Sequence, residues 1–310
     1  RIAQDFENVR SAWCTAIITH DIPALLAAMD ALYHFCMVRS RFQEGADLFS
    51  WSRQTLASAG AHHDAGNDRR RLFAHLAVRE ARFYIMLSRH SEAKALLAPC
   101  LAELRSLDDS AGIATVLVYL GAAATSLGAY EQAQTHLHES LELRCALGDD
   151  WGQAVCHLEL AGLAFYRGDY QMAEIHCAEG LRLAEQAGDP QIIAHLLTGS
   201  SIVARQLGDY AAAQEFIARS LAVYEEMEDP YGVIQGWLTL GGLAYSLVQY
   251  GDAAAHYRRA LDASLALGFR SGEAESHCRL GQIAAAQQQP REAVTHLQVA
   301  LRLTMEIQEA

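Results

Sequence analysis

Histidine is the residue type in this 310-residue chain that most invites a metal site, since fourteen are present. His136 and His138 form an H-x-H pair, and His62 and His63 are adjacent. Residues i and i+2 of a helix point to different faces, so His136 and His138 do not converge. His62 and His63 lie in a segment rich in Gly, Asn and Asp, and we interpret them as a solvated loop pair.

A second set of histidines recurs in steps of 40 residues, with Phe216 in the one slot that lacks His: His136, His176, His256 and His296. Packed helices lie about 8–10 Å apart. Two such histidines are therefore too distant to share a zinc ion, whose nitrogen ligands lie about 2.0–2.1 Å away. We interpret the series as a packing position and expect no bound metal.

Catalytic motifs are absent from the sequence. No G-x-x-x-x-G-K-[ST], H-E-x-x-H or G-x-S-x-G pattern occurs. Adjacent acids such as Asp108-Asp109, Asp149-Asp150 and Glu225-Glu226 fall at expected helix ends or on solvated faces, where nothing makes them converge in a cleft. The sequence predicts no catalytic residues, no cofactor and no enzymatic activity.

Charge and cysteine content limit the partners and the compartment. The net charge is −13 and the longest basic run is Arg69 to Arg71, which opposes binding to nucleic acid. The seven cysteines form no C-x-x-C pair, so we expect reduced thiols and a cytoplasmic location. No signal peptide and no apolar run near 18 residues is present, so no membrane contact is expected.

The elements that must position any site are set by a 40-residue repeat. Three series keep this step: Tyr130, Tyr170, Tyr210 and Tyr250; Ala93, Ala133, Ala173, Ala213, Ala253 and Ala293; and Leu101, Leu141, Leu181, Leu221, Leu261 and Leu301. A fixed period of this size is typical of a solenoid. Each unit is predicted to contain a helix A, a tight turn and a helix B, and the Leu series is expected to pack against the next unit.

Small residues recur where helices A and B should cross closely: Ala81, Gly121, Ala161, Ser201, Gly241 and Gly281. We expect a capping helix in residues 1–20, an irregular helix pair and loop in 21–68, and six regular units in 69–310, about seven units in all. Within the irregular part, residues 22–38 and 42–59 are the predicted helices, and the loop spans Ala59 to Asp68. The chain begins with Arg rather than Met, so we expect it to be part of a longer protein.

The repeat resembles the tetratricopeptide repeat in its pattern of Leu120, Gly121, Tyr130, Ala133, Leu137, Ser140 and Leu141. Only Trp237 matches that family's early tryptophan, and the 40-residue period exceeds the usual 34. This resemblance implies an all-α, right-handed superhelical solenoid of antiparallel helix pairs. The long period, together with DFENVRSAWCTAI and RSRFQEGADLF, is similar to the C-terminal sensor domains of bacterial STAND-type signal-transduction ATPases and transcriptional regulators, such as the maltose-regulon activator.

In that family helix A lines the concave face, which implies a groove for a ligand or partner. The predicted groove residues are Arg82, Trp151, Tyr166, His195, Arg205, Gln206, Tyr231, Gln235, Tyr245 and Glu275. Aromatic walls with a few polar groups suit a small ligand or a peptide. The alternative is that Arg205 is solvated or paired within the molecule.

Two functions follow as hypotheses. The first is a non-catalytic sensor domain of a larger bacterial signalling protein, which binds its effector in the groove and contacts a preceding ATPase module. The second is a general scaffold for protein–protein interaction. The segment Arg291 to Ile307 is apolar on more than one helical face, so we expect either that more helix follows it in the natural protein or that it pairs with another surface, which makes it a candidate site of self-association.

Overall fold

The computed structural model describes residues 2–58 and 66–309, and these residues form fifteen α-helices and no strand. The helices are α1 (Ile2–Ile18), α2 (Ile22–Val38), α3 (Phe42–Ser58), α4 (Asn67–Met86), α5 (His90–Ser106), α6 (Ser110–Ser126), α7 (Tyr130–Leu147), α8 (Asp150–Tyr166), α9 (Tyr170–Ala187), α10 (Pro190–Leu207), α11 (Tyr210–Glu226), α12 (Pro230–Ser246), α13 (Tyr250–Leu267), α14 (Arg270–Ala286) and α15 (Pro290–Glu309).

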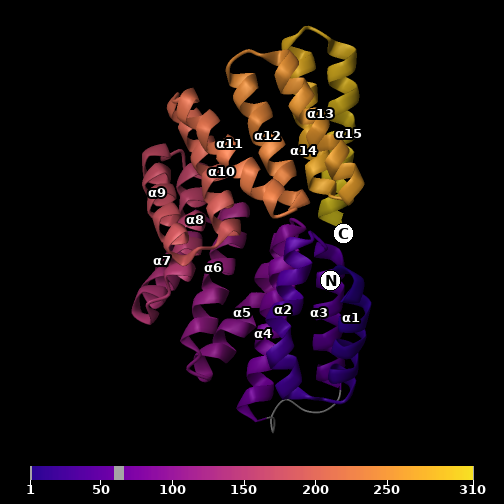
Figure 1. Cartoon of the computed structure of the whole chain (residues 1–310), viewed down its shortest axis with the longest axis vertical. Coiled ribbons are helices and arrows are strands. Elements are labelled where there is room, and N and C mark those ends of the chain that lie inside the picture. Colours follow the sequence, from indigo (N-terminus) through magenta and orange to yellow (C-terminus); the bar gives the residue numbers. More distant parts are fainter. Residues whose placement is uncertain (1, 59–65, 310) are drawn as a thin grey trace. The chain divides into compact units, whose positions relative to one another are not determined.

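The chain divides into two compact units, Arg1–Leu147 and Gly148–Ala310. Within each unit, consecutive helices run antiparallel and pack on their neighbours (Figure 1). The strongest packing joins the two helices of one repeat, as in α8 with α9 and α14 with α15. The predicted all-α solenoid of helix pairs is therefore confirmed.

Helix boundaries follow the repeat. Tyr130, Tyr170, Tyr210 and Tyr250 each begin the second helix of a repeat. The predicted helices before the regular repeats correspond to α1, α2 and α3. Residues 59–65 of the predicted loop lie outside the described residues.

Glycine and aspartate define the turns. Gly168 and Gly208 adopt φ values of +80° and +86°, a left-handed conformation that side chains with a Cβ rarely take. The side chain of Asp229 caps α12 by accepting hydrogen bonds from the backbone N–H groups of Tyr231 and Gly232, both at 3.1 Å. Pro230 occupies the first turn of that helix, where its missing N–H breaks no hydrogen bond.

Small residues allow the close helix crossings that the repeat predicted. Ala213 is completely buried, and its carbonyl accepts a 2.7 Å hydrogen bond from the hydroxyl of Ser201. A Cβ added to Gly121 would lie 2.5 Å from the side chain of Leu137. Real Cβ atoms do not approach other atoms this closely, so the two helices touch because Gly121 has no side chain.

Leu221 is the best-buried member of the Leu series, and it packs against the next repeat as expected. The Cδ2 atom of Leu221 lies 2.3 Å from where Gly236 of the next repeat would place a Cβ. Leu301, the equivalent residue of α15, is 63% exposed.

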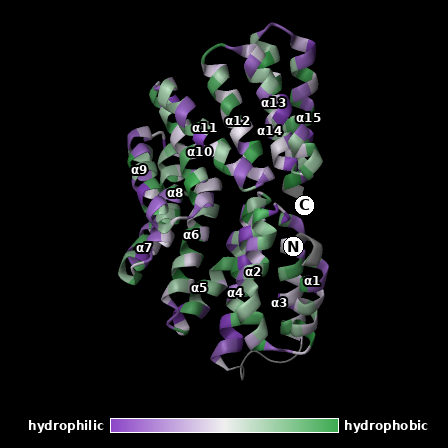
Figure 2. Ribbon diagram, viewed as in Figure 1, coloured by the Kyte–Doolittle hydropathy of each residue, from purple (hydrophilic) through white to green (hydrophobic). Residues whose placement is uncertain are grey.

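Hydrophobic and hydrophilic residues alternate on the labelled helices, as Figure 2 shows. This pattern fits helices that bury one face and hydrate the other. Across residues 2–58 and 66–309, no helix combines the length and apolarity that crossing a bilayer requires.

Candidate functional site

The first helices of successive repeats form the layer that was expected to bind a ligand. In the unit Gly148–Ala310, α8 contacts α10, α10 contacts α12, and α12 contacts α14. Nine of the ten predicted groove residues belong to this unit, and we call the surface that they and their neighbours on these helices occupy the A face. Arg82 belongs to the other unit, where its guanidinium lies 5.3 Å from the ring centroid of Tyr119.

Arg205 is the most distinctive residue of the A face. It is half-buried near the end of α10, and its Nη1 donates a 3.3 Å hydrogen bond to the hydroxyl of Ser246 on α12. Its Nε is buried and has no hydrogen-bond partner, and no acidic side chain among the described residues forms an ion pair with it. Burial lowers the pKa of the Arg205 guanidinium from its ordinary value, because it penalises the charged form.

Gly242 and Tyr257 complete the surroundings of this guanidinium. A Cβ added to Gly242 would lie 3.7 Å from Cζ of Arg205 and 3.7 Å from the hydroxyl of Tyr257. The missing side chain of Gly242 therefore leaves both polar groups uncovered by α12. Tyr257 is 3% exposed, and burial raises the pKa of its phenol to about 12, although Arg279 and Arg205 oppose this shift. Its hydroxyl therefore stays protonated at neutral pH and can donate a hydrogen bond.

A second arginine contributes positive charge. Arg279 on α14 forms a 3.3 Å ion pair with Glu275, and both side chains are more than 40% exposed. Its charge also lowers the pKa of the Arg205 guanidinium, because like charges repel. Two arginines and one glutamate leave an excess of one positive charge here, in a chain whose net charge is −13.

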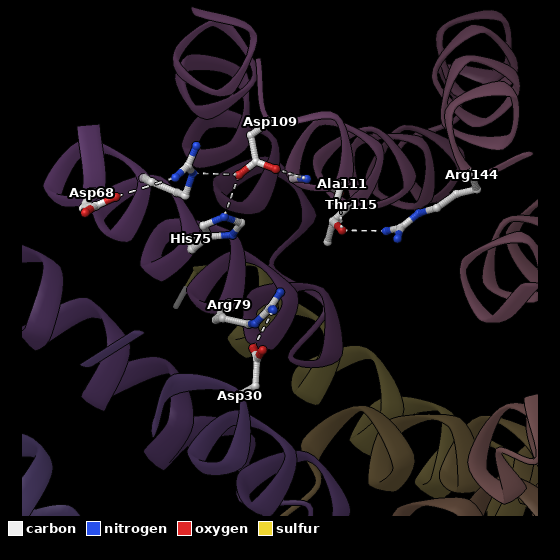
Figure 3. Close-up of polar contacts among 10 residues, drawn as sticks. Asp30, Asp68, His75, Arg79, Asp109, Ala111, Thr115 and Arg144 are labelled. Atoms are coloured by element: carbon white, nitrogen blue, oxygen red, sulfur yellow. Dashed lines mark hydrogen bonds and ion pairs between the residues drawn. The ribbon is translucent and has the colours of Figure 1, made fainter. Parts of the chain in front are cut away.

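The polar residues of the other unit are arranged differently (Figure 3). Arg79 donates a 2.7 Å hydrogen bond to Asp30, and His75 lies 3.0 Å from Asp109. Burial lowers the pKa of His75, and the hydrogen bond and charge of Asp109 oppose this shift. Asp109 also caps α6 by accepting from the backbone N–H of Gly112. Arg79 and His75 therefore have acidic partners, although Nε of Arg79 is also buried without a hydrogen bond, whereas Arg205 has no acidic partner among the described residues.

Three of the predicted residues make intramolecular contacts. The indole N–H of Trp151 donates a 2.7 Å hydrogen bond to Asp189. Tyr231 packs edge-on against Phe269 with ring centroids 5.2 Å apart, and the His195 ring lies 5.7 Å from that of Tyr224. These contacts orient the three side chains along the layer.

The other predicted side chains are more accessible. Tyr166 is 62% exposed and Tyr245 is 36% exposed, and Gln206 is exposed beside Arg205. Gln235 is half-buried on α12. Exposed aromatic and amide groups around a guanidinium provide stacking surfaces and hydrogen bonds for a ligand.

Sequence reasoning missed Tyr257 and Arg279. A signal for Tyr257 was available, because it stands where the other repeats have small or aliphatic residues: Leu97, Leu137, Cys177, Ile217 and Leu297. Arg279 gave no comparable signal, since its repeat position is variable.

Three of the four recurring histidines, His176, His256 and His296, contact a residue 19 positions earlier in the first helix of the same repeat. The Nδ1 atoms of His157 and His176 lie 3.0 Å apart, and those of His277 and His296 lie 2.8 Å apart. His256 stacks on Trp237 with centroids 5.5 Å apart. In the described residues, no group of three or more His, Cys, Asp or Glu is placed to hold a metal ion.

The fold is an all-α solenoid of antiparallel helix pairs. A tetratricopeptide-repeat family model matches residues 153–226, and the structure is a tetratricopeptide-repeat solenoid. No curated protein matches this sequence.

Solved structures with the same fold include two Rap proteins. A Rap protein complexed with competence and sporulation factor has a TM-score of 0.74 and 13% identity, over 90% of this chain and 75% of that one. The Rap conjugation gene regulator of plasmid pLS20, in complex with the Phr* peptide, has a TM-score of 0.73 and 10% identity, over 89% of this chain and 73% of that one.

A third similar structure is a signal-transduction ATPase with numerous domains and a tetratricopeptide repeat sensor, from Pyrococcus horikoshii. Its TM-score is 0.60 and its identity is 14%, over 89% of this chain and 41% of that one. Identities this low establish the shared fold alone.

Proposed function

We propose that this chain is a non-catalytic binding module that recognises a peptide on the A face and anchors an acidic group of that peptide with Arg205 and Arg279. The observation that carries the proposal is the half-buried Arg205, whose Nε makes no hydrogen bond. A buried charge without a partner is costly. A carboxylate of the ligand would provide a charge partner for the part of the guanidinium that remains accessible.

The neighbouring groups suit a peptide. The Ser246 hydroxyl accepts from the guanidinium and donates to the carbonyl of Gly242 at 3.1 Å, and Gly242 leaves room for a main chain to approach. Tyr166 and Tyr245 present exposed rings on the same layer. The two Rap structures, one complexed with competence and sporulation factor and the other with the Phr* peptide, support a peptide as the ligand that we propose for this chain.

The cellular context that we propose is a sensor within a larger bacterial signalling protein or transcriptional regulator. The signal-transduction ATPase supports this, because its tetratricopeptide repeats are described as its sensor. In that context the peptide would alter a contact with an ATPase module. All seven cysteines are free thiols, which suits a cytoplasmic protein. To test this arrangement, the full-length protein would be purified and its rate of nucleotide hydrolysis measured with and without the peptide. A rate that changes with the peptide is the expected result.

The exposed stripe of α15 supports a further contact with a second copy of the chain. Val294, Leu297, Leu301 and Met305 lie on this helix at steps of three and four and are 41–63% exposed. Leu301 is equivalent to Leu221, which packs against the following repeat. Light scattering of wild type and Leu301→Lys tests the contact, and equal masses for both would refute it.

The binding proposal is tested with a decapeptide library that contains matched acidic and amide members. Peptides selected by the wild type should bind Arg205→Ala about 10- to 100-fold more weakly, because a hydrogen bond to a charged group contributes about 1.5–3 kcal/mol. Arg258→Ala is the control, since Arg258 is exposed on α13. Equal affinity of the acidic peptides for Arg205→Ala and wild type would refute the assignment. A selected folded protein that binds without a peptide segment would favour the scaffold function instead.

A further inference from the structure

One repeat lacks side-chain volume at three positions that lie together. Cys177 stands where the other repeats have Leu97, Leu137, Ile217, Tyr257 and Leu297. Ser200 stands where the first regular repeat has Glu80 and the others have Leu120, Leu160, Leu240 and Leu280. Gly199 replaces the larger residues Arg79, Tyr119, Glu159, Thr239 and Arg279. A Cβ on Gly199 would lie 3.6 Å from the sulfur of Cys177, so the deficits adjoin.

A cavity of about 310 Å³ occupies this place. One face of α9 forms a wall with Cys177, Ala178 and Leu181, and α10 contributes Ser200, Val203 and Ala204. The ring of Phe216 on α11 closes another side. The space opens to solvent along an edge formed by Glu174, Arg182 and Glu185, and it lies where this repeat lacks side-chain volume.

The cavity is distinct from the A face. It is lined by α9 and α11, the second helices of their repeats, and by residues of α10 other than His195 and Arg205. Its lining is mostly apolar, and the charged residues Glu174, Arg182 and Glu185 are exposed at its edge.

We propose that this cavity binds a small, neutral aromatic molecule with one hydrogen-bond donor, of the size and chemistry of indole or a phenol. The volume lies at the lower end of small-molecule sites, which are about 300–1,000 Å³. Apolar walls and the Phe216 ring favour an aromatic ligand.

The polar groups of the site select for a neutral molecule. Arg182 is held by Glu179 through hydrogen bonds of 2.5 and 3.0 Å, so the edge offers an anion no free cation. Glu174 at the edge repels anions, whereas Glu185 is paired with Arg219 at 3.6 Å. Burial raises the pKa of the Cys177 thiol to about 11, which keeps it uncharged.

Ser200 provides the one polar contact inside. Its hydroxyl donates a 2.8 Å hydrogen bond to the carbonyl of Leu196, and it is 8% exposed. Since the proton is committed, the oxygen acts as an acceptor, and because it also lies within hydrogen-bond reach of the Cys177 thiol, a donor on the ligand would replace that contact. An indole N–H or a phenol O–H supplies that donor.

Saturation-transfer NMR and calorimetric titration with indole and with 4-methylphenol test the site on the full chain. Cys177→Leu and Ser200→Leu restore the residue of the other repeats and should fold, and each should weaken indole binding at least tenfold by filling the space. Arg205→Ala is the matched control and should bind indole as the wild type does. Benzoate, which is anionic, should not bind.

Two results would overturn the proposal: no saturable binding of either probe to the wild type, or unchanged indole affinity in both leucine variants. Cys177→Val is a milder filling variant that covers the case in which a leucine variant fails to fold. Arg205→Ala removes the proposed anchor of the peptide on the A face and leaves the lining of the cavity unchanged. Peptide binding and indole binding therefore test the two sites separately.

Discussion

Gly241 and Gly242 are adjacent on α12, yet adding a methyl group to each should have different consequences. A Cβ on Gly241 would lie 2.5–2.8 Å from three ring atoms of Tyr257. Favourable carbon–carbon contacts need about 3.5–4.0 Å, so the ring must move by about 1 Å. Tyr257 is 3% exposed and has little free space into which it can move. A Cβ on Gly242 meets its nearest neighbours at 3.7 Å, which is an ordinary contact.

The magnitude follows from comparing the two alanine variants. Replacing a mid-helix glycine with alanine stabilises a helix by about 1 kcal/mol, and this contribution is the same at both positions. The difference between the variants therefore reports the overpacking of the crossing alone, for which we expect about 1–3 kcal/mol. Gly241→Ala should be the less stable variant by that amount.

Urea denaturation followed by circular dichroism measures this difference, with the slope used to check that both variants unfold alike. If Gly241→Ala is as stable as Gly242→Ala, the helices do not cross as closely as the repeat requires.

The same pair of variants also separates an effect on stability from an effect on peptide binding. The methyl group of Gly242→Ala lies beside Arg205 and Tyr257, so this variant should weaken peptide binding without loss of stability.

Further predictions concern buried charge and pH. Glu80 is 1% exposed and accepts hydrogen bonds of 2.7 and 3.1 Å from Arg53. Glu80→Gln should therefore lower the free energy of unfolding, measured by urea titration, by about 2–3 kcal/mol. This is less than the cost of breaking a fully buried ion pair, because Arg53 is partly exposed. An unchanged midpoint would contradict this. Burial lowers the pKa of His157 and of His277 below 6.5, so the unfolded chain binds more protons and stability should fall as the pH drops below about 6.5. For His157 the charge of Glu179 opposes the shift. His157→Leu, which copies the equivalent Leu197, should reduce the loss of thermal stability between pH 7.5 and pH 5.5, and an identical loss in both proteins would refute this role.

The architecture was predictable from the sequence because its causes are local and repeated. The 40-residue step of Tyr130, Tyr170, Tyr210 and Tyr250 located the starts of four helices, since a helix boundary depends on nearby capping and turn residues. The predicted tight turns between the two helices of a repeat fall at Gly168 and Gly208, which take positive φ values, and at Val248, whose φ is positive as well.

The sites could be predicted only in part. Arg205 was identified by its place in the repeat, but its contacts with Ser246 and Tyr257 involve residues 41 and 52 positions away in other helices. Which side chains meet across repeats depends on how each departure from the pattern alters packing, and a repeat period carries no information about those departures.

The cavity beside Cys177 shows most clearly which features the sequence predicts and which only the tertiary structure shows. The sequence by itself determined that Cys177, Gly199 and Ser200 are small where other repeats are large. Only the tertiary structure decided that these deficits leave about 310 Å³ open rather than being filled by neighbouring side chains. The physical reason is that an empty volume is a property of all the atoms around it, and those atoms come from three helices that only folding brings together.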